Sequence, residues 1–226
     1  VTVTPNPSLD LLFEVDELVW NDANRVAPAR ARPGGQGVNA VRAIRELGGR
    51  GLAVLPLGGI VGDQIRRMLE EERTPIRTVD VRAETRVFVG VREHSTGRDL
   101  LLNPRGRRLS AAEVDTLAEA ALSALGVEAR WLACCGSLPA GLPDDFYARL
   151  GAEARQLGVK FVPDCDGMPL RLAAAAGCDL LVPNIHEAGR LLNRPVARAG
   201  AGAAARALLD FGPTHTCITL GADGAV

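Results

Sequence analysis

The segment PGGQGVN (33–39) combines glycines with an asparagine, a pattern that suits the binding of a polar ligand. Glycines have no Cβ, so the backbone can approach a ligand closely, and a helix beginning there presents free N–H groups. The Asn39 amide can donate and accept hydrogen bonds, which suits a sugar hydroxyl. Two alternatives stay open: a flexible turn that caps a helix, or the dinucleotide fingerprint Gly35-x-Gly37-x-x-Ala40. The fingerprint lacks its usual preceding apolar strand and its acidic residue about twenty positions later.

Carboxylates and an amide follow other candidate strands. Asp10 closely follows the β-branched segment VTVT (1–4) and can accept hydrogen bonds from neighbouring hydroxyls. Asn184 and Glu187 are three residues apart, so they share one face of a helix start, where their oxygens could hold Mg²⁺ directly or through water. The alternatives are a turn or capping aspartate at Asp10 and a capping pair at Asn184 and Glu187. Taken alone, each pattern is more typical of the structural role.

Two loops and several arginines complete the set of polar candidates. Ser137 follows a buried strand. The glycines of TLGADGA (219–225) could receive a nucleotide phosphate or ribose, and the structural alternative for this segment is a β-hairpin turn. Arg86 lies in an alternating strand, and arginine binds phosphate bidentately, so a phosphorylated substrate is a natural partner. The arginines at 105, 107 and 108 are more typical of a solvated surface.

A parallel sheet would position these loops, because apolar strand runs alternate with helical patterns along most of the chain. Ligands of such sheets bind at the carboxyl ends of the strands, where the candidate loops fall. Two half-polar strand regions, near 10–19 and 85–103, do not fit that sheet and are interpreted as a small β lid. The regular part consists of strands at 130–135, 159–163, 178–182 and 215–220 and helices at 144–157, 168–176, 185–193 and 200–211.

Composition excludes several classes of protein. The 226 residues carry a net charge of −1, which argues against a broad nucleic-acid surface, and no apolar run is long enough for a membrane span. The sole lysine, Lys160, precedes Phe161, so no Walker A loop is present. Five cysteines without a C-x-x-C pair indicate a reducing cytoplasm.

The order and spacing of the motifs resemble the PfkB/ribokinase-type carbohydrate kinases. The likeness is to their phosphosugar branch, which includes the minor 6-phosphofructokinase, 1-phosphofructokinase and tagatose-6-phosphate kinase. It extends over essentially the whole chain. The motifs that carry it are TPNPSLD (4–10), PGGQGVNAVRAIRELGG (33–49), ETR (84–86), CGSLPAG (135–141), VPD-x-x-G (162–167), PNIHE (183–187) and TLGADGA (219–225).

This resemblance implies a three-layer α/β/α core, formed by 1–9, 31–84 and 104–226, with a β lid at 10–30 and 85–103. It implies a cytoplasmic homodimer joined through the lid. The implied reaction is phosphoryl transfer from ATP, with Mg²⁺, to a phosphorylated ketohexose. Fructose 6-phosphate is the first expected substrate, and fructose 1-phosphate or tagatose 6-phosphate the second.

The resemblance also assigns expected roles to individual residues. The sugar would be held by Asp10, Gly34, Gly35, Asn39 and Ser137, and its existing phosphate by Arg86. The nucleotide would lie along Asn184, Thr219, Gly221 and Gly224, and Asn184 with Glu187 would organise Mg²⁺, mainly through water.

Several departures from the family pattern qualify these expectations. The family's Gly-Ala-Gly-Asp segment, with the general-base aspartate, would follow Val226, so the 226 residues are expected to be an inactive fragment of a longer kinase. Val182 and Ala23 replace two lysines, and Phe88 replaces an asparagine. Arg25 could partly replace the missing lid lysine. The alternatives are a non-catalytic binder of sugar phosphate or nucleotide and, with less support, a dinucleotide-dependent oxidoreductase.

Overall fold

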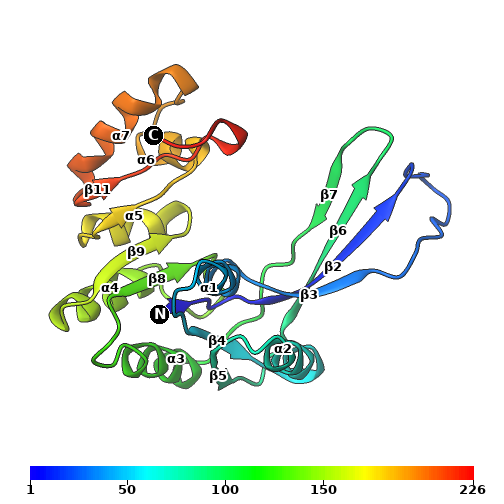
Figure 1. Cartoon of the computed structure of the whole chain (residues 1–226), viewed down its shortest axis with the longest axis horizontal. Helices are drawn as coiled ribbons and strands as arrows, with labels where there is room; N and C mark the ends of the chain where they lie inside the picture. The colour runs from blue at the N-terminus through cyan, green and yellow to red at the C-terminus, as the bar shows by residue number, and fades with distance from the viewer.

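The computed structural model describes residues 1–226 and is built on a parallel sheet with helices on both sides (Figure 1). Every strand pair in its five-stranded sheet is parallel, and a shorter parallel pair continues beyond the last strand. The Asp179 amide donates to the Phe161 carbonyl at 2.9 Å and joins the two parts. The predicted, mainly parallel α/β architecture is therefore confirmed. The strand order is β5 (Ile76–Asp80), β4 (Ala53–Leu57), β1 (Thr2–Val3), β8 (Trp131–Cys135), β9 (Lys160–Asp164), then β10 (Leu180–Leu181) and β11 (His215–Thr216).

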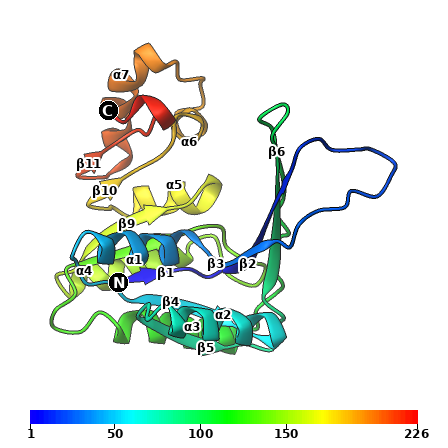
Figure 2. The ribbon, with the colours of Figure 1, turned by 45° about the vertical axis from the view of Figure 1, so that its right-hand side comes forward.

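Strand β4 shows why helices must cover both faces. All five of its residues are buried, and successive side chains of a strand point to opposite faces. Leu55 and Leu57 pack in one apolar cluster with residues of α1 and α2, whereas Val54 joins the larger cluster with residues of α3 and α4. Figure 1 shows the helices on the two sides of the sheet, and Figure 2 shows the same core turned by 45°. The helices are α1 (Gln36–Glu46), α2 (Gly59–Glu71), α3 (Ala111–Ser123), α4 (Phe146–Gln156), α5 (Gly167–Ala175), α6 (Ile185–Leu191) and α7 (Ala201–Leu208).

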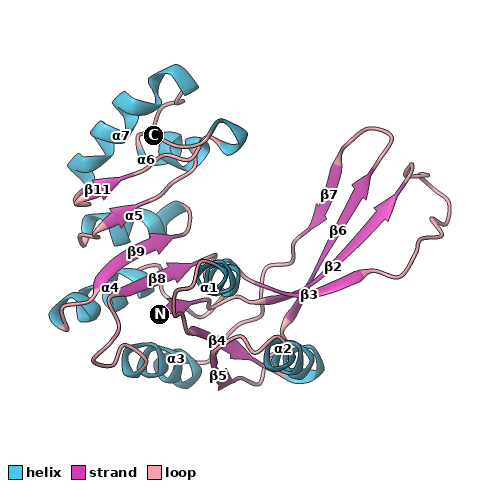
Figure 3. Ribbon diagram, viewed as in Figure 1, coloured by secondary structure: helices cyan, strands magenta, loops and turns pink.

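A second sheet of four strands projects from the core (Figures 1 and 3). Its centre is a parallel pair of β2 and β6, whose register runs from Ser8 opposite Arg86 to Val15 opposite Glu93. The two flanking strands are antiparallel. This sheet is the small lid sheet that the sequence predicts. Its order is β3 (Arg30–Gly34), β2 (Ser8–Val15), β6 (Arg86–Glu93) and β7 (Asp99–Leu102).

Some elements differ from the predicted ones. Residues 31–34, which we expected in the core, pair with β2 as part of β3. Their sequence does not predict a strand, because proline and glycine, here Pro33 and Gly34, are both depleted in strands. The edge strand β5 was not predicted, because only one of its five residues is fully buried. Strands β10 and β11 contain two residues each, fewer than predicted. No helix is both long and apolar enough to cross a membrane.

Candidate active site

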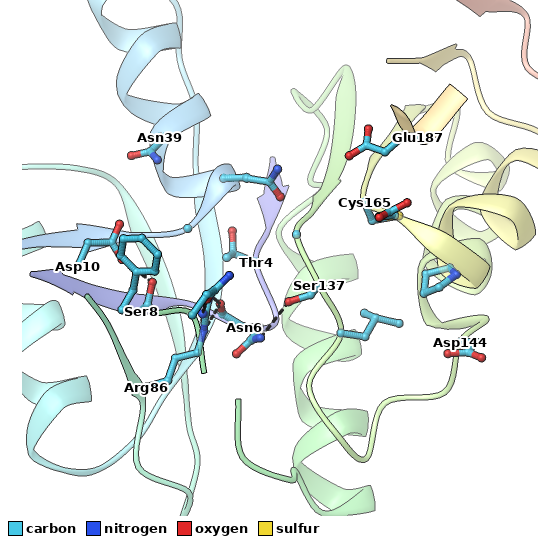
Figure 4. A pocket seen from close by; sticks show the side chains of 18 residues that line it. Thr4, Asn6, Ser8, Asp10, Asn39, Arg86, Ser137, Asp144, Cys165 and Glu187 are labelled. Atoms are coloured by element: carbon cyan, nitrogen blue, oxygen red, sulfur yellow. Dashed lines mark hydrogen bonds between the residues drawn. The ribbon is translucent and has the colours of Figure 1, made fainter. Parts of the chain in front are cut away.

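A polar cavity of about 600 Å³ lies at the carboxyl ends of the core strands, between the core and the lid (Figure 4). The lid contributes residues of β2 and β6, and the core contributes the loops that follow β1, β8 and β9. This is the edge of a parallel sheet where ligands bind. The lining residues are Thr4, Asn6, Ser8, Asp10, Gly35, Gln36, Asn39, Arg86, Phe88, Asn103, Gly136, Ser137, Leu138, Asp144, Cys165, Asp166, Pro169 and Glu187.

Asp10 is a half-buried carboxylate at the lid side of this cavity. The Ser8 hydroxyl donates to Asp10 Oδ1 at 2.6 Å, which leaves Oδ2 to accept from a ligand hydroxyl. Gly34 lies directly against the carboxylate, because a Cβ at this position would lie 2.2 Å from Asp10 Oδ1. Gly34 therefore makes room for Asp10 and does not itself line the cavity.

The start of α1 forms the adjoining part of the wall. Gly35 precedes the helix with a φ of 127°, a conformation that favours glycine, and no side chain caps the helix. The first N–H groups of α1 consequently have no side-chain partner. The neighbouring Thr4 hydroxyl is buried without any hydrogen-bond partner. Asn39 ends the first turn of α1 and lines the cavity. The predicted glycine-to-helix arrangement is thus present.

Arg86 is half-buried beside Asp10, at the base of the lid. Its guanidinium donates to the Asn6 carbonyl at 3.0 and 3.3 Å, to the Pro104 carbonyl at 3.2 Å and to the Asn103 side chain. Burial lowers the pKa of Arg86, and the negative charge of Asp10 partly opposes this effect. Arginine starts from so high a pKa that it stays a cation at neutral pH. The cavity therefore holds one fixed positive charge.

The opposite wall is acidic, and Asp144, Asp166 and Glu187 line it. Asp164, at the end of β9, does not line the cavity, but its charge interacts with that of Glu187 on α6. Burial raises the pKa of Asp164, and the nearby charge of Glu187 raises it further. Carboxylate oxygens are the ligands that a hard divalent cation such as Mg²⁺ prefers. Asp166 also faces the cavity, but Arg190 binds both of its oxygens, at 3.0 and 2.6 Å. Glu187 is therefore the carboxylate of this wall that lines the cavity without an arginine partner and with a second carboxylate charge close by.

Asn184 and Glu187 also form the capping box of α6. Asn184 Oδ1 accepts from the amides of His186 and Glu187 at 2.9 and 3.0 Å, and Glu187 Oε2 accepts from the Asn184 amide at 2.8 Å. The structural alternative for this pair is thus present in the structure. Glu187 nevertheless lines the cavity, whereas Asn184 does not.

The loop after β11 lies beside the start of α6. Thr219 forms a parallel bridge with Asn184, and its amide donates to the Pro183 carbonyl at 3.0 Å. Gly221 begins a short 3₁₀ turn, and Gly224 ends it. None of these loop residues lines the 600 Å³ cavity. The structure therefore groups Thr219, Gly221 and Gly224 with Asn184, apart from the predicted sugar-binding residues.

Sequence reasoning missed several cavity residues. Asn6 is one of them, and its side chain donates to the Ser137 hydroxyl at 3.0 Å, which joins the loops after β1 and β8. Burial and nearby Asp164 raise the pKa of the Cys165 thiol, so this cavity residue is a poor nucleophile. A position just after a strand was the signal available for most of them. The missed residues are Thr4, Asn6, Ser8, Gln36, Phe88, Asn103, Gly136, Leu138, Asp144, Cys165, Asp166 and Pro169.

Tyr147 supports the turn that carries Ser137. Its buried hydroxyl lies 3.1 Å from the carbonyls of both Cys135 and Gly136. We expect Tyr147→Phe to lower the free energy of unfolding by roughly 1–2 kcal/mol, because these buried carbonyls lose their partner. The corresponding fall in Tm is about 2–8 °C for a chain of this size. Thermal unfolding measures this change, and an unchanged Tm would contradict the assigned role.

The parallel sheet covered on both faces, with a β lid over a polar cavity, defines a ribokinase-like fold. Residues 6–226 match the model of the pfkB family of carbohydrate kinases, and the chain belongs to this family. The predicted family, fold and class of enzyme, a carbohydrate kinase of the phosphofructokinase type, are confirmed.

Two curated relatives and one solved structure show how closely the chain is related. It is 31% identical to ATP-dependent 6-phosphofructokinase isozyme 2 of Mycobacterium tuberculosis, over the whole chain and 67% of that protein. It is 27% identical to 1-phosphofructokinase of Bacillus subtilis, over the whole chain and 73% of that protein. Escherichia coli phosphofructokinase-2, solved with fructose-6-phosphate, superimposes with a TM-score of 0.91 at 30% identity, over 99% of this chain and 74% of that one. These relatives favour a kinase over the dinucleotide-dependent alternative.

Proposed function

We propose that the chain belongs to a kinase that transfers a phosphoryl group from ATP to a phosphorylated ketohexose. Fructose 6-phosphate is the first substrate, and fructose 1-phosphate or tagatose 6-phosphate is the second. The observation that carries this proposal is the placement of Asp10 and Arg86 on two paired lid strands that face one cavity. A carboxylate accepts hydrogen bonds from sugar hydroxyls, and a guanidinium pairs with a phosphate. A sugar phosphate carries hydroxyls and a phosphate on one molecule, so it can bind Asp10 and Arg86 at the same time.

The remaining roles follow from the position of each residue. Asn39, Ser137 and the Gly35 backbone would contact the sugar. Mg²⁺ would be held by Asp164 and Glu187, with Asn184 contributing through water, and it would neutralise charge on the transferring phosphate. The general-base aspartate is proposed to follow Val226. The nucleotide would lie along Asn184, Thr219, Gly221 and Gly224.

We further propose that the protein is a cytoplasmic homodimer joined through the lid. Leu12 and Leu101 lie on the same face of the lid sheet as Asp10 but farther from the core, and they are 40% and 61% exposed. Exposed leucines on one face of a sheet, here on either side of Gly90 of β6, favour contact with a second copy. Sedimentation velocity would test this proposal, since a monomer at micromolar concentration would contradict it.

The substrate class is tested with matched ligands. Fructose 6-phosphate and fructose differ only in the phosphate, so the phosphorylated sugar should bind much more tightly in calorimetry. ADP formation should then be measured with MgATP and the same pair of sugars. Turnover of non-phosphorylated sugars but not of sugar phosphates would overturn the substrate class. Ligand binding without ADP formation would favour the non-catalytic alternative, whereas turnover abolished by Glu187→Ala would exclude it.

The Asp164 carboxyl predicts how stability depends on pH and metal. Burial and the charge of Glu187 raise the pKa of Asp164 in the folded protein. The folded state is therefore most stable below the ordinary pKa of an aspartate, and it loses this stability as the pH rises through the raised pKa and Asp164 becomes charged. We expect Asp164→Asn to raise the metal-free Tm at neutral pH, but not in acid. Mg²⁺ should raise the Tm of the unmodified protein and not of the variant. Asp115→Asn, on an exposed part of α3, is the control. A lower metal-free Tm at neutral pH for Asp164→Asn would contradict this prediction.

A further inference from the structure

Arg42 contacts one of the proposed sugar-binding residues from behind the cavity wall. It lies three residues after Asn39 on α1, on the same face of the helix. Arg42 Nη1 donates to Asn39 Oδ1 at 3.0 Å and to the Pro33 carbonyl at 2.9 Å. Its side chain is only 11% exposed. Arg42 does not line the cavity, so any influence on a ligand must act through Asn39.

Glu72, just after α2, fixes the orientation of this guanidinium. Arg42 Nε donates to Glu72 Oε2 at 2.8 Å, and Arg42 Nη2 donates to Glu72 Oε1 at 3.0 Å. The Thr74 hydroxyl donates to Glu72 Oε2 at 3.3 Å. A bidentate pair of this kind restricts rotation of the planar guanidinium. All three nitrogens of Arg42 are therefore engaged, and Nη1 remains directed at Asn39.

The chemistry of the guanidinium determines which way the Asn39 amide faces. A guanidinium has N–H donors and no acceptor, so the Asn39 atom beside it must be the oxygen. The amide nitrogen, with its two donors, then faces away from Arg42. Figure 4 shows Asn39 at the edge of the cavity, on the same side as Asp10 and above it in the view. Asn39 consequently offers donors to a ligand, although an isolated asparagine could offer either group.

We propose that Arg42 and Glu72 are positioning residues that make Asn39 a hydrogen-bond donor to the substrate. This inference rests on the proposed function, in which Asn39 contacts the sugar. Asp10 has the opposite character, because a carboxylate only accepts. The two residues together require a ligand with a hydroxyl donor near Asp10 and an oxygen lone pair near Asn39. The Arg42–Glu72 pair thus determines part of the sugar specificity without touching the sugar.

A double-mutant cycle on the full-length protein tests this inference. The variants are Asn39→Ala, Arg42→Met and the combination, and the probe is fructose 6-phosphate or fructose 1-phosphate, whichever binds the unmodified protein more tightly. We expect Arg42→Met to weaken binding about tenfold, because the freed amide can turn its oxygen to the ligand. In the Asn39→Ala background, Arg42→Met should have no further effect, since coupled residues are not additive. Thermal unfolding without ligand measures the stability change separately.

Matched variants separate positioning from general damage to α1. Arg45→Met removes an exposed arginine from the same helix whose contact is the Glu72 carbonyl, at 3.5 Å, and it should leave the affinity unchanged. Arg42→Lys keeps a cationic donor group but not the planar fork, and it should recover part of the affinity lost in Arg42→Met. Glu72→Gln, which retains Arg42, should weaken binding less than Arg42→Met and serves as a second test if Arg42→Met does not fold.

The possible failures are distinguishable. Equal losses on Arg42→Met in both backgrounds would mean that Arg42 acts on the whole helix, and would overturn the inference. An unchanged affinity in Arg42→Met would overturn it as well. An unchanged affinity in Asn39→Ala would instead remove Asn39 from the proposed sugar site, and with it the proposed function of this residue.

Discussion

Replacing Asp10 by alanine should lower kcat/KM for fructose 6-phosphate by about 10²–10⁴-fold in the full-length enzyme. The carboxylate lies on the lid side of the cavity, with Ser8 donating to Oδ1 and with Oδ2 free to accept. A hydrogen bond to a charged group contributes about 1.5–3 kcal/mol, and a ketohexose can offer two hydroxyls. Steady-state kinetics with MgATP, together with calorimetry of the sugar phosphate alone, would measure the loss in turnover and in binding.

The control for this prediction is another acidic residue of the lid. Asp16 lies just beyond β2 and is exposed, so Asp16→Ala should leave kcat/KM unchanged. Asp10→Ala should fold normally, because its carboxylate is half-buried and Gly34 leaves space around it. Activity within about twofold of the unmodified enzyme would be inconsistent with Asp10 as the principal acceptor of the sugar hydroxyls.

Arg86→Met should reduce kcat/KM for fructose 6-phosphate by about 10²–10³-fold, with a far smaller effect on the binding of fructose. The reason is the loss of a bidentate, charge-assisted contact to the phosphate. Arg86 also donates to the carbonyls of Asn6 and Pro104, so the variant should lose stability as well. The ratio of affinities for fructose 6-phosphate and fructose separates the two effects, because lost stability lowers both affinities equally.

Two further variants make the Arg86 prediction specific. Arg86→Lys keeps the charge but loses the planar fork, so it should recover part of the discrimination. Arg92→Met removes an exposed arginine of the same strand that pairs with Asp99 near the outer end of the lid, and it should leave the ratio unchanged. If the affinity ratio stays the same in Arg86→Met, another group must bind the phosphate.

The fold was predictable where burial dictates the residue pattern. Strand β8 is an example: its sequence, residues 131–135, is apolar throughout and lies within the strand predicted at 130–135. The pattern is weaker at the edges. Strand β3 contains Pro33 and Gly34, and it exists because its backbone pairs with β2, a contact between distant parts of the chain. Its formation depends on tertiary pairing, which local propensity does not encode.

The site was predictable where polar residues lie close to the ends of predicted strands or at the start of a predicted helix. Asp10, Asn39, Arg86, Ser137 and Glu187 meet at one cavity. Their proposed ligands stay predictions.

Other parts of the site were not predictable from local patterns. Gly34 leaves space for the Asp10 carboxylate, which packs directly against it. Thr219 lies beside Asn184 because the two residues form a parallel β-bridge. Arg42 had no sequence signal, because its partner Glu72 is thirty residues away and is brought to it when α1 and α2 pack on the same face of the sheet.

The parallel pairing of β2 with β6 has a consequence for evolution. The cavity residues Ser8, Asp10, Arg86 and Phe88 all lie on these two strands, which contribute none of the buried residues in the larger apolar cluster of the core. Substitutions at these positions can change which sugar fits while the larger cluster remains intact. Acceptor preference can therefore diverge between descendants of one ancestor faster than the scaffold, and an exchange of these two strands between relatives offers a direct route to altered specificity.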